Sequence, residues 1–443
     1  MKNNLIIKNC DVLRLQDGKV IVDVAQDIFI QGNQIQSIKP TGITYPEGKI
    51  FDASGMLATP GFINTHAHVP MVLFRGLAED VTTAAWFNDY IFPIESNLTP
   101  EDVYWGAMLG IAEMIENGVT SVADHYFYMD DVARAIEDSG MRANLVWAVF
   151  GHEGEEKLDQ TAEFIQRWQG KADGRITTWL GPHAPYTTGP DFLKLSVKKA
   201  RELNVGIHTH VSESSDQVAM SLDEFNMTPV RLLEDCGVLD LPTILAHCAY
   251  PTDEDIQILK KYPTGVGHAP KTFMKGGKGI VTLSHFRDNG IPVGLATDGA
   301  ASNNTMDILE AMRLSALSQK HKAQDSTAFP LYDVLDTAFN GSARVLKMGD
   351  KLGALAAGKL ADLILIRQDG LNVLPRYNPA ANLVYSSRST DIDTVICNGK
   401  ILMKNRELLT VDKAQIKKEV VQRLDRLNKI IPGKRVATYP TRE

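Results

Sequence analysis

The spacing of hydrophobic and polar positions changes twice along the chain. From residue 1 to about 55, short apolar stretches alternate with polar residues around turns such as Gly32-Asn33, as in antiparallel strands. The same alternation of apolar and polar residues returns in 358–366 and 390–403, with a turn at Asn398-Gly399. Because chain ends often lie near each other, we expect one small β-sandwich domain built from both termini. Its predicted limits are 1–56 and 353–443, including a C-terminal helix over 411–431 that has helical spacing of Val, Ile and Leu.

The middle of the chain, 57–352, alternates short apolar segments with stretches of helical period such as 99–117 and 192–204. Near-continuous apolar strands separated by helices indicate a parallel sheet covered by helices. Eight such units predict an α/β fold of the (β/α)8 TIM-barrel type. A doubly wound sheet would carry a Gly-rich phosphate loop after its first strand, and none is present. The eight segments are 61–69, 118–126, 142–150, 175–185, 204–214, 243–250, 264–270 and 291–302.

Chemically active side chains gather at the ends of these segments, on the face where TIM barrels place their active sites. Six segments carry a His near the end, and Asp298 ends the eighth. His66 and His68 are two residues apart on one strand, so both imidazoles point the same way. With His210 and Asp298 they form a ligand set suited to a catalytic zinc that keeps one position open for water. We therefore predict one Zn²⁺ per subunit, although iron can occupy similar sites.

Three further histidines end strands without an assigned role in metal binding. His208 shares a strand face with His210 and is expected to support the ligands. His125 is interpreted as a core imidazole, and His268 either as a donor behind the ligands or as another core imidazole.

Composition and charge exclude several classes of protein. The chain has 443 residues, 44% hydrophobic and 23% charged, with a net charge of -8. No basic patch is indicated, so neither nucleic acid nor a membrane surface is an expected partner. The N-terminus lacks the apolar core of a signal peptide, which predicts a cytoplasmic protein. The cysteines are scattered, which argues against disulfides and a thiolate zinc site: Cys10, Cys236, Cys248 and Cys397.

Taken together, several segments resemble the amidohydrolase superfamily, more narrowly its cytosine/adenosine-deaminase-like branch, and there most nearly the S-adenosylhomocysteine and 5'-methylthioadenosine deaminases. The resemblance covers nearly the whole chain. It implies a hydrolytic deaminase of an adenine nucleoside (S-adenosylhomocysteine, 5'-methylthioadenosine, 5'-deoxyadenosine or adenosine), in which zinc hydroxide attacks C6 and ammonia leaves. The segments are 60–80, 92–121, 181–187, 208–214, 246–250, 292–304 and 352–366.

The same resemblance implies a role for each site residue. His66, His68, His210 and Asp298 bind zinc, in agreement with the assignment from strand positions. Glu213 is the proton shuttle: it protonates N1 and then the leaving amino group. His247 orients the attacking water, and Asp298 takes the proton of that water. Glu95 contacts the substrate by accepting hydrogen bonds from ribose hydroxyls, and His183 and Trp86 are further substrate contacts. Ser302, at the same site, forms a hydrogen bond with Asp298. Binuclear relatives bridge their ions with a Lys or Glu of a middle strand, and the fourth strand has none.

Two departures concern the part of the substrate beyond the ribose. Relatives typically have an Asn after the His of the seventh strand and a Ser-Asn pair further on. In this chain the corresponding segment, 268–275, contains neither. Near 152–157, the homocysteine-type enzymes tend to carry an Arg for the substrate carboxylate, and this chain offers His152 and Lys157. The metal and proton chemistry is unaffected, but the 5' substituent stays open.

Three alternatives to an adenine-nucleoside deaminase remain. The enzyme could be an aminohydrolase or chlorohydrolase of another heterocycle, such as a guanine-type base, a pterin or a triazine. It could be a ring-opening amidohydrolase, although Glu213 after His210 favours deamination. An inactive ligand-binding barrel is disfavoured because each chemical position is filled. Barrels of this family often associate, so a homo-oligomer is an expected state.

Overall fold

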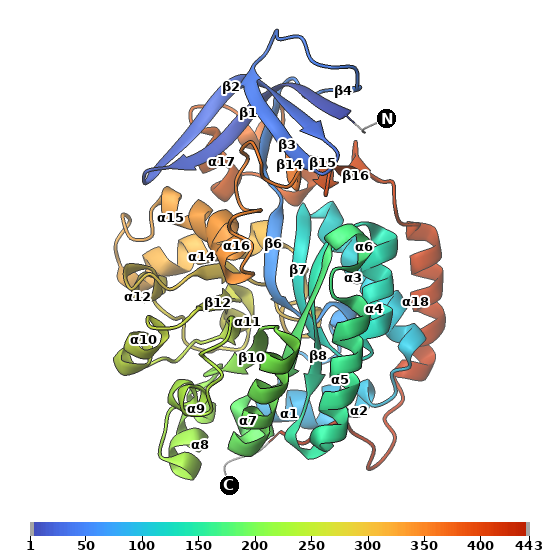
Figure 1. Ribbon diagram of the computed structural model, residues 1–443, viewed down its shortest axis with the longest axis vertical. Coiled ribbons are helices and arrows are strands. Elements are labelled where there is room, and N and C mark those ends of the chain that lie inside the picture. Colours follow the sequence, from blue (N-terminus) through green and yellow to red (C-terminus); the bar gives the residue numbers. More distant parts are fainter. Residues whose placement is uncertain (1–3, 440–443) are drawn as a thin grey trace.

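The computed structural model describes residues 4–439, so the predicted domain ends at 1–3 and 440–443 lie outside the described residues. Figure 1 shows a barrel with a sheet-rich part at one end, built from the first and the late strands of the chain. Within 4–439, no helix combines the length and the hydropathy that crossing a membrane requires.

The barrel is a sheet of eight parallel strands, and each strand falls inside one of the eight predicted segments. The first and last strands approach where the backbone N–H of Asp298 donates to the carbonyl of His66 at 3.0 Å. Nearby, the Thr65 hydroxyl donates to the carbonyl of Leu295 at 2.8 Å. The prediction of a (β/α)8 barrel is therefore confirmed. In sheet order the strands are β6 (Phe62–Ala67), β7 (Val119–Tyr126), β8 (Arg142–Val149), β9 (Ile176–Pro182), β10 (Ile207–Val211), β11 (Thr243–His247), β12 (Thr264–His268) and β13 (Val293–Leu295).

Helices cover the outside of the barrel (Figure 1). The start of α3 follows from its sequence: Thr99 caps the helix and Asp102 bonds back to the cap, in a capping box, with Pro100 in the first turn. The longer helices around the barrel are α3 (Pro100–Glu116), α4 (Met129–Ser139), α5 (Gly154–Trp168), α7 (Pro185–Leu203), α8 (Ser215–Phe225), α9 (Pro229–Asp235), α10 (Asp253–Leu259) and α14 (Ile308–Ala323). Three short ones follow the last strands: α12 (Leu283–Asp288), α15 (Leu331–Asp336) and α16 (Ser342–Val345).

Shorter helical segments sit in the loops, and several of them line the site described below. The chain leaves β6 through η1 (Val69–Phe74), α1 (Thr83–Ala85), η2 (Trp86–Ile91) and α2 (Phe92–Glu95). Loop helices elsewhere are η3 (Gly151–Glu153), α6 (Lys171–Gly174), α11 (Pro270–Lys275), α13 (Ala300–Asn303), η4 (Thr337–Gly341), η5 (Leu371–Val373), α17 (Pro379–Tyr385) and η6 (Ser389–Asp391).

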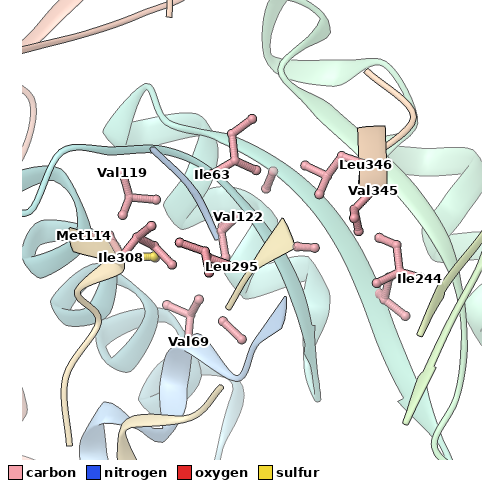
Figure 2. Close-up of a cluster of buried hydrophobic side chains, with 14 of the residues drawn as sticks. Ile63, Val69, Met114, Val119, Val122, Ile244, Leu295, Ile308, Val345 and Leu346 are labelled. Atoms are coloured by element: carbon pink, nitrogen blue, oxygen red, sulfur yellow. The ribbon is translucent and has the colours of Figure 1, made fainter. Parts of the chain in front are cut away.

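A continuous hydrophobic core joins strands and helices of the barrel (Figure 2). Ile63, Val122 and Leu295 come from strands, while Met114 and Ile308 come from the helices that pack over them. All five side chains are buried. Removal of this much apolar surface from water stabilises the barrel and fixes the strand ends that carry the polar side chains.

The two ends of the chain meet in a second sheet of nine strands, in the order β17-β16-β15-β14-β5-β1-β2-β3, with β4 also paired to β1. Its own buried core draws on both ends, including Ile7, Ile28, Leu363 and Ile396. The predicted β-sandwich from both termini is confirmed, whereas its exact limits stay a prediction. The strands are β1 (Asn4–Gln16), β2 (Lys19–Gln31), β3 (Gln34–Pro40), β4 (Lys49–Asp52), β5 (Met56–Pro60), β14 (Leu363–Arg367), β15 (Ile392–Cys397), β16 (Lys400–Lys404) and β17 (Glu407–Leu408).

Charged contacts fasten the terminal segments to the barrel. The guanidinium of Arg142, at the start of β8, donates to both oxygens of Asp362 at 2.8 and 3.0 Å, and both side chains are buried. The C-terminal helix α18 (Lys413–Leu427) lies within the predicted stretch 411–431 and beside α3, where Arg423 pairs with Glu101 and Asp102. Helix α18 is therefore held against α3 of the barrel.

Candidate active site

The four predicted metal ligands converge at the carboxyl end of the barrel. His66 and His68 come from the end of β6, His210 from β10, and Asp298 from the loop directly after β13. Oδ1 of Asp298 lies 3.6 Å from Nε2 of His66 and 3.3 Å from Nε2 of His68. Nε2 of His210 lies 3.4 Å from Nε2 of His68. Side chains from three separate strands thus present their ligand atoms to one small volume.

Hydrogen bonds behind the cluster orient each imidazole. Nδ1 of His68 donates to the carbonyl oxygen of His125 at 2.6 Å, and Nδ1 of His210 donates to that of His183 at 2.7 Å. Nδ1 of His66 lies 3.0 Å from Nε2 of His208. Because Nδ1 is engaged in all three, Nε2 is the nitrogen turned to the centre, which is the usual arrangement around a bound metal.

The protonation states of the cluster also suit a cation. Burial lowers the pKa of His66 to about 4 and holds the pKa of His210 well below its usual value, so these imidazoles are neutral and can donate a lone pair. Burial raises the pKa of Asp298, but the bond to His66 and the nearby His247 and His68 hold it well below its usual range. Asp298 is therefore the anion of the cluster. Its Oδ2 accepts from Ser302 at 3.1 Å.

The cluster fits a metal ion on its own geometry. Nε2 of His66 is buried and has no hydrogen-bond partner among residues 4–439, which is costly unless the atom binds something. Ligand atoms of His66, His68 and Asp298 lie within 4.8 Å of one another, as do those of His66, His210 and His247. Imidazole nitrogens with one carboxylate oxygen are a donor set that zinc accepts.

Glu213 and His247 stand beside the cluster. His247 ends β11 with a φ of 75°, and burial lowers the pKa of its imidazole. Glu213 lies in the loop after β10, where its Oε1 is 2.5 Å from Nζ of Lys278. Burial raises the pKa of Glu213, but the Lys278 ammonium and His247 outweigh that effect and lower it to about 2.

A cavity of about 650 Å³ opens onto the cluster, within the size range of sites for small ligands. Tyr126 donates to Oε1 of Glu95 at 2.7 Å on its wall, and burial raises the pKa of Glu95 to about 7. Nδ1 of His183 lies 2.9 Å from the hydroxyl of Thr187. The structure brings the predicted catalytic and substrate-contacting side chains to this cavity: Trp86, Glu95, His183, Glu213, His247, Asp298 and Ser302.

Other histidines and lysines considered from the sequence are placed as follows. Nζ of Lys157 lies 4.7 Å from the centre of the Trp147 ring, and His152 stacks on Phe150; neither side chain lines the cavity. His268 is buried with both ring nitrogens unpartnered within the described chain. His125 lines the cavity, and its ligand atom lies within 4.8 Å of those of His68 and His210. It is interpreted from the sequence as a core imidazole, but it lies at the edge of the ligand cluster.

Polar residues of the cavity wall that were not predicted from the sequence include Tyr186, Lys278 and Tyr439. Tyr439 belongs to the segment after α18, which passes α2 where the N–H of Val436 donates to the carbonyl of Phe92 at 3.2 Å. The backbone of Tyr439 forms two hydrogen bonds with the Asn88 side chain, at 2.8 and 3.1 Å. No sequence pattern marks Tyr439, whereas the glycines around Lys278, after the seventh strand, are a weak signal of a loop at the active face.

The chain is similar to several known proteins over nearly its whole length. A 5-methylthioadenosine/S-adenosylhomocysteine deaminase of Carboxydothermus hydrogenoformans is 43% identical over 424 residues, 95% of this chain and 97% of the relative. A protein of the same name from Desulforudis audaxviator is 40% identical over 96% of this chain and 99% of its own. Among solved structures, a zinc-bound adenosine deaminase from Xanthomonas campestris superposes with a TM-score of 0.92 at 27% identity, covering 96% and 98%.

A second solved structure has a different reaction in its name. An atrazine chlorohydrolase from Arthrobacter aurescens TC1, complexed with zinc, superposes with a TM-score of 0.87 at 25% identity, covering 95% of this chain and all of that one. The barrel and its neighbours define the class as a barrel hydrolase, and its His/Asp cluster could bind a metal ion. Residues 57–402 match the model of the amidohydrolase family. The chain belongs to the amidohydrolase family.

Proposed function

We propose that this protein is a metal-dependent hydrolytic deaminase of an adenine nucleoside: S-adenosylhomocysteine, 5'-methylthioadenosine, 5'-deoxyadenosine or adenosine. The observation that carries the proposal is the Glu213 carboxylate, which faces the same cavity as the His/Asp cluster. A deaminase needs an acid for the ring nitrogen beside a site that activates water, and these two features meet here. The names of the curated relatives support the same reaction class.

We further propose that His66, His68, His210 and Asp298 hold one zinc ion, and iron would fit the same donors. The zinc in the two solved neighbours supports this choice. When bound, the ion lowers the pKa of a water molecule and so supplies a nucleophile at neutral pH. The Nδ1 hydrogen bonds described above keep the imidazoles in place whether or not substrate is present.

The remaining steps belong to side chains of this chain. Asp298 takes a proton from the attacking water, whose oxygen forms a bond to C6, and His247 orients that water. Attack moves electron density onto N1, where Glu213 delivers the water proton that Asp298 has passed to it. Glu213 then takes the proton left on the added oxygen and passes it to the amino group, the C6–N bond breaks, and ammonia leaves with the bonding electron pair. The net reaction adds one water and releases one ammonia.

The rest of the cavity fits the sugar and the ring. Glu95 accepts hydrogen bonds from ribose hydroxyls, and its Oε1 also accepts one from the Tyr126 hydroxyl. His183 and Trp86 contact the substrate. Cytoplasmic location and a homo-oligomeric state stay predictions.

A substrate panel tests the proposed reaction. Zinc-loaded enzyme is expected to release ammonia from at least one of four nucleosides: adenosine, 5'-deoxyadenosine, 5'-methylthioadenosine and S-adenosylhomocysteine. Guanine, a pterin and atrazine enter the same panel, because the atrazine chlorohydrolase shares this fold. Turnover restricted to these three compounds would replace the nucleoside proposal with the second candidate, a hydrolase of another nitrogen heterocycle.

Glu95 gives a sharper test of how the nucleoside is held. Glu95→Ala removes a buried acceptor, and a charge-assisted hydrogen bond to ribose is worth about 1.5–3 kcal/mol. We therefore expect kcat/KM for nucleosides to fall by about 10- to 150-fold, while any activity on free adenine changes little. Steady-state ammonia release from both substrates measures the difference. Equal losses on nucleoside and base would remove Glu95 from ribose binding.

A further inference from the structure

Lys278 is a cavity cation that contacts the proposed proton shuttle. Its Nζ lies 2.5 Å from Oε1 of Glu213. The two side chains are only 13% and 12% exposed, and both line the cavity. Because an ion pair shielded from water is weakly screened by solvent and salt, its geometry constrains the carboxylate more than a surface pair would.

The loop that carries Lys278 is anchored on both sides. The backbone N–H of Lys278 donates to the carbonyl of Phe273, a fully buried residue of α11, at 2.8 Å. The next N–H, of Gly279, donates to the Tyr250 hydroxyl at 2.6 Å. Lys278 thus comes from the loop after β12, while its partner Glu213 comes from the loop after β10. The ion pair joins two loops that surround the cavity.

Glu213 is also held from the helix that follows it, α8. Its backbone N–H donates to Oε1 of Gln217 at 3.1 Å, and Nε2 of Gln217 lies 3.5 Å from Oε2 of Glu213. Lys278 holds one carboxylate oxygen and Gln217 approaches the other. Ion pair and amide contact together fix the direction of the Glu213 side chain.

We infer that Lys278 is a positioning residue for proton transfer, holding the Glu213 carboxylate toward the substrate and in its ionised form. The inference rests on the proposed function, because it assigns Lys278 a part in the same reaction. Glu213 must accept a proton before it can deliver one to N1. A neighbouring ammonium ensures that the carboxylate is free to accept.

The sign of the pH effect follows from this charge pair. With its pKa lowered to about 2, Glu213 stays ionised over the working pH range and loses its charge only as pH falls through that value. An adjacent opposite charge lowers a carboxyl pKa by about 1–3 units. Removing Lys278 should therefore move the acid limb of the kcat/KM–pH profile to higher pH by about 1–3 pH units. The titratable groups that face Glu213 are Lys278, His247, Asp298, His183, Tyr186 and Tyr439.

The test compares Lys278→Met and Lys278→Arg with the wild type, all zinc-loaded, using ammonia release from 5'-methylthioadenosine across pH. We expect the Met variant to lose activity with its acid limb moved upward by about 1–3 pH units. The Arg variant, which keeps the charge, should keep the wild-type acid limb. The matched control is Lys271→Met, since Lys271 pairs with Glu310 at 2.8 Å and does not line the cavity. Its pH profile should be that of the wild type.

A second readout does not depend on turnover. Carbon-13 NMR of glutamate-labelled, zinc-loaded protein, with Glu213→Gln to assign the signal, follows the ionisation of Glu213 directly. An upward shift of that titration in Lys278→Met supports the inference even if the nucleosides prove not to be substrates. An unchanged titration and acid limb in Lys278→Met would overturn it. An inactive wild type on the whole panel would instead count against the proposed function.

Discussion

Replacing Glu213 by Gln is expected to reduce kcat/KM by about 10²–10⁴-fold, the usual contribution of a positioned acid or base. The amide keeps the size of the side chain but cannot carry a proton from water to N1. Zinc content should be unchanged, because Glu213 is not one of the metal ligands. Steady-state ammonia release and metal analysis on the same preparation measure both quantities.

Glu310→Gln serves as the control for this variant. Glu310 also pairs with a lysine, Lys271, but lies outside the cavity, so its loss should leave kcat/KM near the wild-type value. Wild-type turnover by the Glu213→Gln enzyme with zinc still bound would remove Glu213 from the mechanism.

Removing the metal is expected to have the other large effect. Mutating the residues that hydrogen-bond to metal ligands typically lowers metal affinity or activity by about 10–100-fold. Loss of the ion itself should therefore lower activity by more than about 100-fold. Chelator-treated enzyme should regain ammonia release when zinc is added back. Parallel addition of ferrous iron under anaerobic conditions tells which ion the site uses.

A ligand variant separates the metal from the rest of the protein. His66→Ala should lose stoichiometric zinc, since Nε2 of His66 is buried with no other partner in the described chain. His321→Ala, at an exposed histidine on α14, should retain it. Full activity in the chelated enzyme, with no metal detected, would contradict the proposed centre.

The barrel was predictable because its strands are buried on both faces. Segment 142–150 is a nearly continuous apolar run, as expected of a strand in a parallel sheet covered by helices. Eight such segments without a Gly-rich phosphate loop favoured a barrel over a doubly wound sheet. The ligand cluster was predictable for a related reason. Parallel strands place their ends on one face, so His66, His210 and Asp298 are brought together by topology alone.

Contacts between loops were not predictable in the same way. The pairing of Lys278 with Glu213 depends on how two loops fold over the barrel, and no periodic pattern encodes that. Lys157 illustrates the converse: it lies near the position where homocysteine-type relatives tend to carry an Arg for the substrate carboxylate, yet its ammonium lies over the Trp147 ring. Short-range patterns determine strands and helices, whereas the shape of the cavity wall depends on distant packing.

The position of Tyr439 has a practical consequence for handling the protein. Only four residues would separate Tyr439, whose side chain lines the cavity, from a purification tag fused after Glu443. We expect a bulky fusion this close along the chain to a cavity residue to change the measured kinetics. The first strand, β1, lies at the opposite end of the molecule from α1 and α2 (Figure 1), so a tag at the amino end is the suitable choice for every assay described above.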